Sequence, residues 1–170
     1  MCLELTLKAS RKPFVAKRDI KCMKVMIKIT DENGKVRYHS VFIDTDFQYH
    51  IGEVASVKGV ECKGPSYRKR IEYGLHSFRT NVLGWKRLAI WIEENRYLFI
   101  DSHGKNFEAV VFECVIPKGS KYFKGNSNTV IGDEEEVGYA SDQLLPVKEV
   151  PRSEWEWYTE IKGARAVHQK

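Results

Sequence analysis

Two runs rich in β-branched and aromatic residues, joined through an Asn-Gly step, constrain the fold of this chain more than any other feature. In the first run, IKCMKVMIKI, Val25, Ile27 and Ile29 share one face of an extended segment, and Lys24 and Lys28 share the opposite face. Asn33-Gly34 separates it from the second run, KVRYHSVFID. An Asn-Gly pair in this setting favours a type I′ hairpin turn, which needs positive φ at both central residues. The sequence therefore predicts antiparallel strands at about 20–30 and 35–43.

Further β signals lie in the last third of the chain. FEAVVFECVI (107–116) alternates apolar residues on both faces, and Pro117 with Gly119 ends the run. SKYFKG then restarts a strand briefly, and YASDQLLPVKEV (139–150) predicts a last strand. The polar and acidic stretch 126–138 between them is predicted to be a mobile loop.

One segment, TNVLGWKRLAIWIEENR, has the spacing of an amphipathic helix. Its apolar residues recur three and four apart: Val82, Trp85, Leu88, Ala89 and Ile92. Thr80 or Asn81 offers a side-chain oxygen to cap the free amides of the first turn, whereas Gly84 weakens that turn. RYLFID (96–101) continues this apolar face or forms a strand.

Together these elements predict an α+β fold dominated by strands. We expect an antiparallel sheet of about five to seven strands, curled or partly closed, with one main helix at about 81–95 packed on it. A length of 170 residues suits a single globular domain over 1–150. Residues 151–170 are predicted to be a docked segment and a flexible C-terminal tail.

Cysteine spacing and hydropathy exclude several classes of protein. The four cysteines, at positions 2, 22, 62 and 114, form no CxxC pair and stand beside no histidine, so no zinc site is expected. The first residues, MCLELTLKASRKP, contain no apolar run of the signal-peptide type, and no segment has the length of a transmembrane helix. Reduced thiols and a cytoplasmic location are therefore predicted.

The net charge of +5 results from 28 basic and 23 acidic residues, and the excess is concentrated near the N-terminus. A solvated charged face and an anionic partner such as nucleic acid are both compatible with this pattern. The basic residues concerned are Lys8, Arg11, Lys12, Lys17, Arg18, Lys21, Lys24 and Lys28.

The octapeptide YGLHSFRT (73–80) is the most chemically varied stretch of the chain. At a junction between loop and helix, His76 and Ser77 can donate to a phosphate or a sugar hydroxyl, with Arg79 as a further ligand-binding candidate. The structural alternative is that Leu75 and Phe78 anchor a turn in the core while the polar residues cap the helix. On this spacing we expect both apolar side chains to be buried and His76 to line a small pocket.

Catalytic signatures are otherwise scarce. The chain has no GxSxG elbow, no phosphate loop of GxxxxGK[ST] spacing and no cysteine beside a histidine. The acidic runs DEEE (133–136) and EE (93–94) are typical of solvated surface.

Three sequence elements resemble a group of short uncharacterised proteins encoded by bacteriophages and gut bacteria. The elements are MCLELTLKASRKPFVAKRDIKCMKV, YGLHSF, and VFECVIPKGSKYFKGNSN followed by GYASDQLLPVKEV. In that group a Gly-(Leu/Phe)-His-Ser-Phe element and an Ile-Pro-Lys-Gly-(Ser/Thr)-(Lys/Arg)-Tyr strand pair recur in this order. The resemblance covers about half of the chain and implies a phage- or mobile-element-type protein, without implying an activity.

A more distant resemblance is to the ADP-ribosyltransferase and RNA 2′-phosphotransferase folds. Their NAD or ribose sites use a histidine just after a Gly-Leu-like step, with a tyrosine or serine on neighbouring strands. The positions that match here are Tyr73, His76 and Ser77, and Glu113 is the best-placed candidate for the late catalytic acid. A second signature strand has no counterpart in this sequence.

Two functions of different classes follow. The first is a non-catalytic binding module of a phage or mobile element, which needs no cofactor and acts in the cytoplasm on a host macromolecule or a small ligand. The alternative is an NAD- or ribose-binding enzyme centred on His76. A third expectation, nucleic acid binding through the basic N-terminal region, predicts an affinity that falls steeply with salt.

Overall fold

The computed structural model describes residues 3–5, 9–41, 47–96, 99, 107–127 and 136–156. Within them lie one long helix, α1 (Val82–Glu94), a short helical turn at 152–156, and thirteen strands. The strands are β1 (Leu3–Glu4), β2 (Phe14–Val15), β3 (Ile20–Thr30), β4 (Val36–His39), β5 (Gln48–Tyr49), β6 (Ala55–Ser56), β7 (Glu61–Lys63), β8 (Arg70–Tyr73), β9 (Leu75–Arg79), β10 (Phe107–Ile116), β11 (Lys121–Ser127), β12 (Gly138–Ser141) and β13 (Gln143–Val150).

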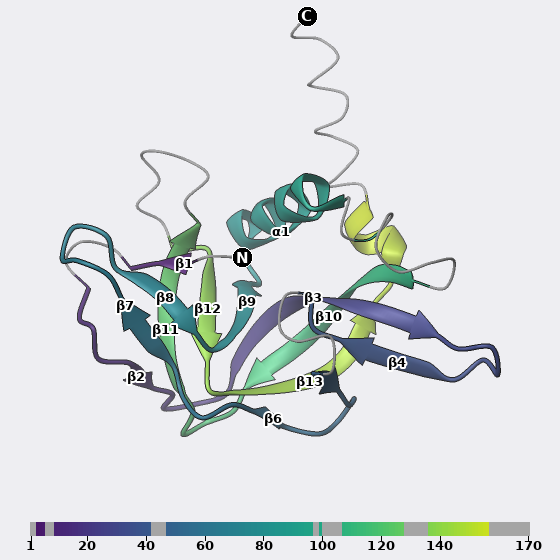
Figure 1. Ribbon diagram of the computed structural model, residues 1–170, viewed down its shortest axis with the longest axis horizontal. Coiled ribbons are helices and arrows are strands. Elements are labelled where there is room, and N and C mark those ends of the chain that lie inside the picture. The colour runs from purple at the N-terminus through teal and green to yellow at the C-terminus, as the bar shows by residue number, and fades with distance from the viewer. Residues whose placement is uncertain are drawn as a thin grey trace, which may run out of the picture.

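The strands form one antiparallel sheet with the order β6-β13-β10-β3-β9-β12-β11-β1-β8-β7. Strand β2 adds to β11, and β4 joins β3 to β5. The sheet curls strongly but its two ends do not pair, and α1 lies across one side of it (Figure 1). The strand-dominated α+β prediction is therefore confirmed. The predicted number of strands was too low, because several strands are only two residues long and carry no periodic pattern.

The predicted hairpin is present, although its turn is of a different type. Strands β3 and β4 pair in register from Ile27↔His39 to Thr30↔Val36. Gly34 has a φ of 79°, but no non-glycine residue in the described chain has positive φ, so the turn is not type I′. The Asp31 carboxylate instead accepts hydrogen bonds from the amides of Asn33 and Lys35, at 2.9 and 2.8 Å, which closes a turn one residue longer. Strand β4 ends at His39, and residues 42–46 lie outside the described residues.

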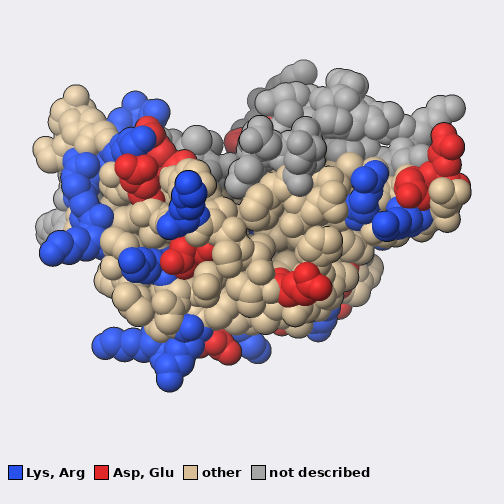
Figure 2. All heavy atoms as spheres, turned by 60° about the horizontal axis from the view of Figure 1, so that its bottom comes forward, with Lys and Arg blue, Asp and Glu red and all other residues tan. Residues whose placement is uncertain are grey.

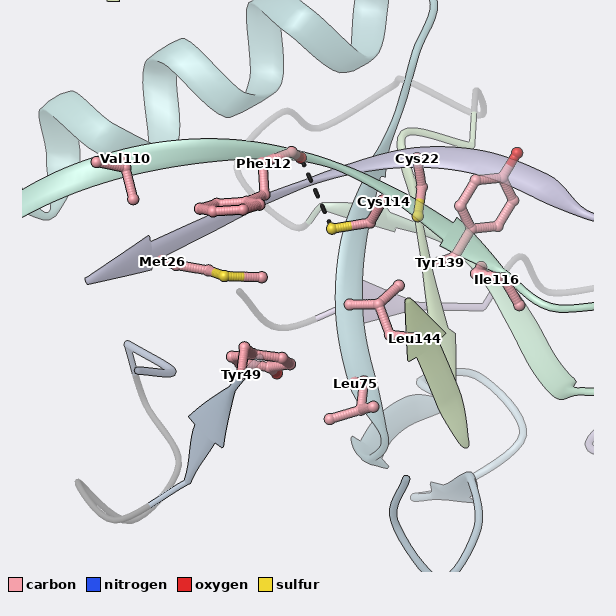
Figure 3. Close-up of a cluster of buried hydrophobic side chains, with 10 residues drawn as sticks. All are labelled: Cys22, Met26, Tyr49, Leu75, Val110, Phe112, Cys114, Ile116, Tyr139 and Leu144. Atoms are coloured by element: carbon pink, nitrogen blue, oxygen red, sulfur yellow. Dashed lines mark hydrogen bonds between the residues drawn. The ribbon is translucent and has the colours of Figure 1, made fainter. Parts of the chain in front are cut away.

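Strand β10 forms the longest ladder of the sheet. It pairs with β3 along its full length, from Phe107↔Ile29 to Ile116↔Ile20, and with β13 on its other edge. Because side chains alternate across a strand, β3 and β10 contribute to a core on each face of the sheet. Met26 and Phe112 belong to the first core, where they lie close to Tyr49 of β5 (Figure 3).

The second core lies between the sheet and α1. Met23, Val25 and Val111 face Leu88 and Ile92 of the helix there. The short turn at 152–156 adds a further side chain to this core, that of the buried Trp155. A third, smaller cluster joins Leu3 of β1 to Ile71 of β8 and Phe123 of β11.

The start of α1 confirms the sequence prediction and explains its one unfavourable residue. Asn81 is the N-cap, and its side chain accepts a hydrogen bond of 2.8 Å from the Gly84 amide. A Cβ at Gly84 would overlap the carbonyl oxygen of Arg79, at the end of β9. The glycine therefore allows the first turn to lie directly on the backbone of the preceding strand.

Other predicted segments are only partly described. The predicted loop at 126–138 falls largely on residues 128–135, and the predicted tail on 157–170, which lie outside the described residues, as does most of 96–101. No helix of the described chain has the length and apolar character needed to cross a bilayer.

The close contact between Gly84 of α1 and Arg79 of β9 gives a stability prediction. Alanine normally stabilises a helix interior by about 1 kcal/mol relative to glycine, but Gly84→Ala is expected to destabilise the protein by about 1–3 kcal/mol, because the new methyl group has no space. Urea unfolding followed by circular dichroism measures this. Lys86→Ala, at an exposed position of the same helix, is the control and should change stability by less than about 0.5 kcal/mol. A stabilised Gly84→Ala variant would show that α1 does not lie this close to β9.

Candidate functional site

A break in the sheet beside β3 creates the candidate site. One edge of β3 is fully paired with β10, whereas the other edge is divided between two strands. Strand β9 pairs with it at Cys22 and Met23 only, and β4 pairs with it from Ile27 onward. The intervening residues 24–26 have no ladder partner on this edge among the described residues. The sheet therefore opens between β9 and β4.

A cleft of about 1150 Å³ occupies this opening. Its walls are the unpaired part of β3, the chain after β4, the segment 56–58, strand β8 with the start of β9, and the inner face of α1. These elements surround the centre of the molecule in Figure 1. The apolar lining residues are Val25, Val41, Phe47, Val57, Ile71, Phe78 and Trp91, and the polar ones are Lys24, Ser40, Ser56, Lys58, Arg70, Glu72, Tyr73 and His76.

Lys24 is the unusual residue of the cleft because it points into a hydrophobic core. It lies between Cys22 and Met26 on β3, and both of these neighbours belong to the first core. Only 7% of the lysine is exposed. Its Nζ donates a hydrogen bond of 2.6 Å to the carbonyl oxygen of His76 and lies 5.5 Å from the centre of the Tyr49 ring. The amine thus links β3 to β9 just beyond the point where the ladder between these two strands ends.

No carboxylate of the described residues forms an ion pair with this amine. The lack of such a partner affects the pKa of the lysine. Burial lowers the pKa of Lys24 from 10.5 to about 8, and the nearby thiols of Cys114 and Cys22 oppose this only in part. The ring of Tyr49 and one carbonyl oxygen are weaker partners for a cation than a carboxylate. At pH 7 about one tenth of the amine is therefore neutral, far more than for an ordinary lysine.

His76 is neutral in the same cleft. Burial first, and then the charge of Lys24, lower its pKa from 6.5 to about 3. Its Nδ1 atom is buried and has no hydrogen-bond partner in the described part of the chain. Buried polar atoms are usually paired, and an orphan atom beside a cleft is a position where a ligand or water can bind.

Most of the octapeptide that contains His76 is strand β9, which follows the last residue of β8 and Gly74, and it is not a junction between loop and helix. Leu75 and Phe78 are buried, with 0% and 4% exposed, which confirms the prediction for both. They do not point in the same direction, because residues three apart in a strand face opposite sides. Leu75 enters the first core and Phe78 the second. Ser77, which was expected to face away from the core with His76, is completely buried on the side of Leu75.

The other candidate residues are distributed over different parts of the fold. Tyr73 lines the cleft beside His76. Arg79 lies at the end of β9, where its Nη1 donates a hydrogen bond of 3.3 Å to the carbonyl oxygen of Glu136. Glu113 is paired with Lys148 at 3.3 Å on the neighbouring strand and does not line the cleft. The structure therefore brings together Tyr73 and His76, and leaves Ser77, Arg79 and Glu113 elsewhere.

Three residues that line the cleft, two aromatic ones and a buried lysine, were not predicted from the sequence. Phe47 and Trp91 were not selected, and Lys24 was grouped with the solvated basic residues. A signal for Lys24 was present, because the alternation of IKCMKVMIKI puts it on the same face as Cys22 and Met26. Glu72 lines the cleft and is the acid nearest in sequence to Tyr73 and His76.

Comparison of the chain with protein-family models, with curated proteins and with solved structures finds no match in any of the three. Within the described part of the chain, no three His, Cys, Asp or Glu side chains come together as a possible metal site.

The buried amine predicts a pH-dependent stability. The pKa of Lys24 is about 8 in the folded chain and about 10.5 when unfolded, so the unfolded chain binds more protons between these values. The contribution of Lys24 to the free energy of unfolding should therefore rise with pH through this window, by up to about 3 kcal/mol. The raised pKa values of Cys22 and Cys114 act in the opposite direction at alkaline pH, so the contribution is read as the difference between wild type and a Lys24 variant. Lys24→Met is expected to be more stable than wild type at pH 7 and to lose this rise, because it removes a buried charge.

Urea unfolding at pH 7 and pH 10 tests this expectation. Lys28→Met is the matched control on the same strand, since Lys28 is paired with Glu108 at 3.3 Å and with Glu149 at 3.5 Å, and these carboxylates raise its pKa. It should show no gain in stability at pH 7. An unchanged pH dependence in Lys24→Met would mean that the Lys24 amine is not desolvated.

Truncation of the two buried residues of β9 should be costly. Leu75→Ala and Phe78→Ala are each expected to destabilise the protein by about 2–5 kcal/mol, because each leaves a cavity in a packed core. His76→Ala should cost much less, since its ring borders the cleft and its Nδ1 atom has no partner to lose. Thermal unfolding of the three variants gives the order, and a His76→Ala variant as unstable as Leu75→Ala would assign the histidine a structural role.

Proposed function

We propose that the chain is a binding module for a small organic anion, which it holds in the cleft between β9 and β4. The observation that carries this proposal is the buried amine of Lys24, which lies in the cleft wall with no carboxylate partner among the described residues. A buried cation without a counter-charge is unfavourable. An anionic ligand would supply that charge, and the volume of about 1150 Å³ suits a molecule of drug or nucleotide size.

The balance of charges in the cleft supports an anion. Lys58 and Arg70 join Lys24 in the lining, and among the described lining residues one carboxylate, that of Glu72, opposes them. Arg70 shares the Glu4 carboxylate at 3.4 Å and remains 46% exposed, so its guanidinium retains donors for a ligand. Guanidinium groups suit carboxylates and phosphates because they offer two parallel donors.

The apolar part of the cleft supports a ligand with a flat or aromatic body. Phe78 and Trp91 lie with ring centres 6.4 Å apart, and both line the cleft. Phe47 contributes a third ring from the chain before β5. A ligand body placed against these rings would bury apolar area, while its anionic group would reach the cationic part of the lining.

The NAD- or ribose-binding alternative has one observation in its favour. Tyr73 and His76 line the same cleft as Glu72, so a tyrosine, a histidine and an acid are available in one place. Glu113, the acid expected from sequence, is not among them. NAD therefore belongs in a ligand panel, and a response to NAD that depends on His76 would favour the enzyme.

Nucleic acid binding through the N-terminal basic residues stays a prediction. Lys24 is buried and Lys28 is ion-paired, so neither extends a basic surface. Basic side chains do gather at the end of the molecule that contains β7 and β8 (Figure 2). There, Arg68 and Lys63 are paired with Glu4 and Glu72. The phage- or mobile-element setting likewise stays a prediction from the sequence resemblance.

A thermal-shift panel tests the proposal. The panel contains aromatic carboxylates, nucleoside phosphates and NAD, and a ligand present at 100 times its Kd should stabilise the protein by about 2.7 kcal/mol. Arg70→Ala and Lys58→Ala should each weaken a hit several-fold, because each removes a cation from the cleft. Lys148→Ala is the control, since Lys148 is paired with Glu113 away from the cleft.

The proposal is contradicted if hits persist unchanged in Arg70→Ala and Lys58→Ala, or if only uncharged compounds stabilise the protein. Retention of the chain on DNA at low salt, together with no hit in the panel, would instead favour the nucleic acid partner.

A further inference from the structure

We propose that Lys24 binds carbonyl compounds covalently, as an imine formed between its Nζ and an aldehyde or ketone held in the cleft. This inference rests on the proposed function, because the carbonyl compound occupies the same cleft as the organic anion. It also narrows the ligand class to a small molecule that carries both a carbonyl group and a carboxylate or phosphate.

The position of the amine supports this assignment. Nζ is fixed by a hydrogen bond to the His76 carbonyl oxygen, and this acceptor comes from the backbone and not from a carboxylate. Lys24 nevertheless lines a cleft large enough for an organic ligand. Lys28, four residues along the same strand, shows the contrast because two carboxylates hold its ammonium group. An amine without an ion pair is more readily deprotonated, and the neutral form is the nucleophile.

The reaction balances with the groups present. The lone pair of neutral Nζ forms a bond to the carbonyl carbon, and the carbonyl oxygen takes up the proton that nitrogen loses, which gives a carbinolamine. Loss of the hydroxyl group with a second proton from nitrogen then releases water and leaves the C=N bond. No oxidant or reductant is needed.

The lining also explains why the carbonyl compound would carry a negative charge. Formation of an imine at Lys24 removes one cation from the cleft, but Lys58 and Arg70 remain available to an anionic group at the far end of the ligand. The aromatic residues Phe47 and Trp91 can contact its body. Binding energy from these remote groups would hold the carbonyl carbon near the amine.

Reductive methylation of the wild-type protein tests the reactivity of the amine without requiring any ligand to bind. Formaldehyde and sodium cyanoborohydride are added in limiting amounts at pH 7, and peptide mapping by mass spectrometry follows each lysine. Lys24 is expected to react at least about ten times faster than Lys28, because each unit of pKa gives a tenfold change in the neutral fraction. Equal or slower methylation of Lys24 overturns the inference.

A matched pair of probes then separates the imine from binding. Pyridoxal 5′-phosphate carries an aromatic ring, a phosphate and an aldehyde, and pyridoxine 5′-phosphate is the same molecule with an alcohol in place of the aldehyde. The aldehyde should give an imine absorption band that saturates at one equivalent, and borohydride should fix the adduct at Lys24. Lys24→Arg should abolish the band and Lys28→Arg should leave it unchanged.

The outcomes distinguish the two proposals. If the alcohol stabilises the protein in a thermal shift but the aldehyde modifies only exposed lysines, the cleft binds anions and the imine inference is overturned. If formaldehyde selects Lys24 while neither phosphate compound binds, the amine is reactive and the proposed anion site is wrong. Saturable modification at Lys24, lost in Lys24→Arg and competed by the alcohol, supports both.

Discussion

The long pairing between β3 and β10 is the constraint on which the rest of the structure depends. Ten consecutive residues of each strand are paired in register, so every residue of β3 between Ile20 and Ile29 is assigned to one of two faces. One face joins the core around Phe112, and the other joins the core beneath α1. A shift of one residue would exchange the two sets of side chains. This register therefore determines that Lys24 points into a core.

The free edge of β3 accounts for the cleft. Two strands, β9 and β4, share this edge, and neither reaches residues 24–26, which on this edge have no ladder partner among the described residues. A buried lysine at this gap is unfavourable for stability, and a methionine of similar length would fit the surrounding core. A residue that contradicts an otherwise consistent pattern is more often explained by function than by folding. Lys24 lowers the stability of the fold and yet lies in the wall of a cleft, and this combination is the reason to assign it a role in ligand binding.

The elements of the fold could be predicted from sequence where the pattern was long. The strand pair around the Asn-Gly step, the run 107–116 and the helix with its Asn81 cap were all identified, because periodicity and capping are local properties. The predicted type of turn was wrong because the Asp31 carboxylate accepts hydrogen bonds from the turn, and the preference of Asn-Gly pairs for type I′ turns does not take these bonds into account. The two-residue strands could not be found, since they are defined by partners distant in the chain.

The candidate site was only partly predictable for a related reason. His76 and Tyr73 were selected for their chemistry, and both line the cleft. Lys24 was missed because its burial depends on Tyr49 and His76, which join it only after the sheet has formed. Glu113 was selected as the best-placed candidate for the catalytic acid of the distant family resemblance, but its partner Lys148 lies on a neighbouring strand that sequence alone could not pair with it.

Gly74 has a consequence for how the cleft responds to a ligand. It joins β8 to β9 with a φ of 138°, and a Cβ there would lie 2.9 Å from Val60 and 3.3 Å from Ala140. Strand β8 is held by β1, and β9 is held by β12, so this single wall is anchored at both ends. The opposite wall belongs to the β3–β10 ladder. A wall anchored in this way is preorganised, and a ligand would select among side-chain rotamers without having to separate the strands.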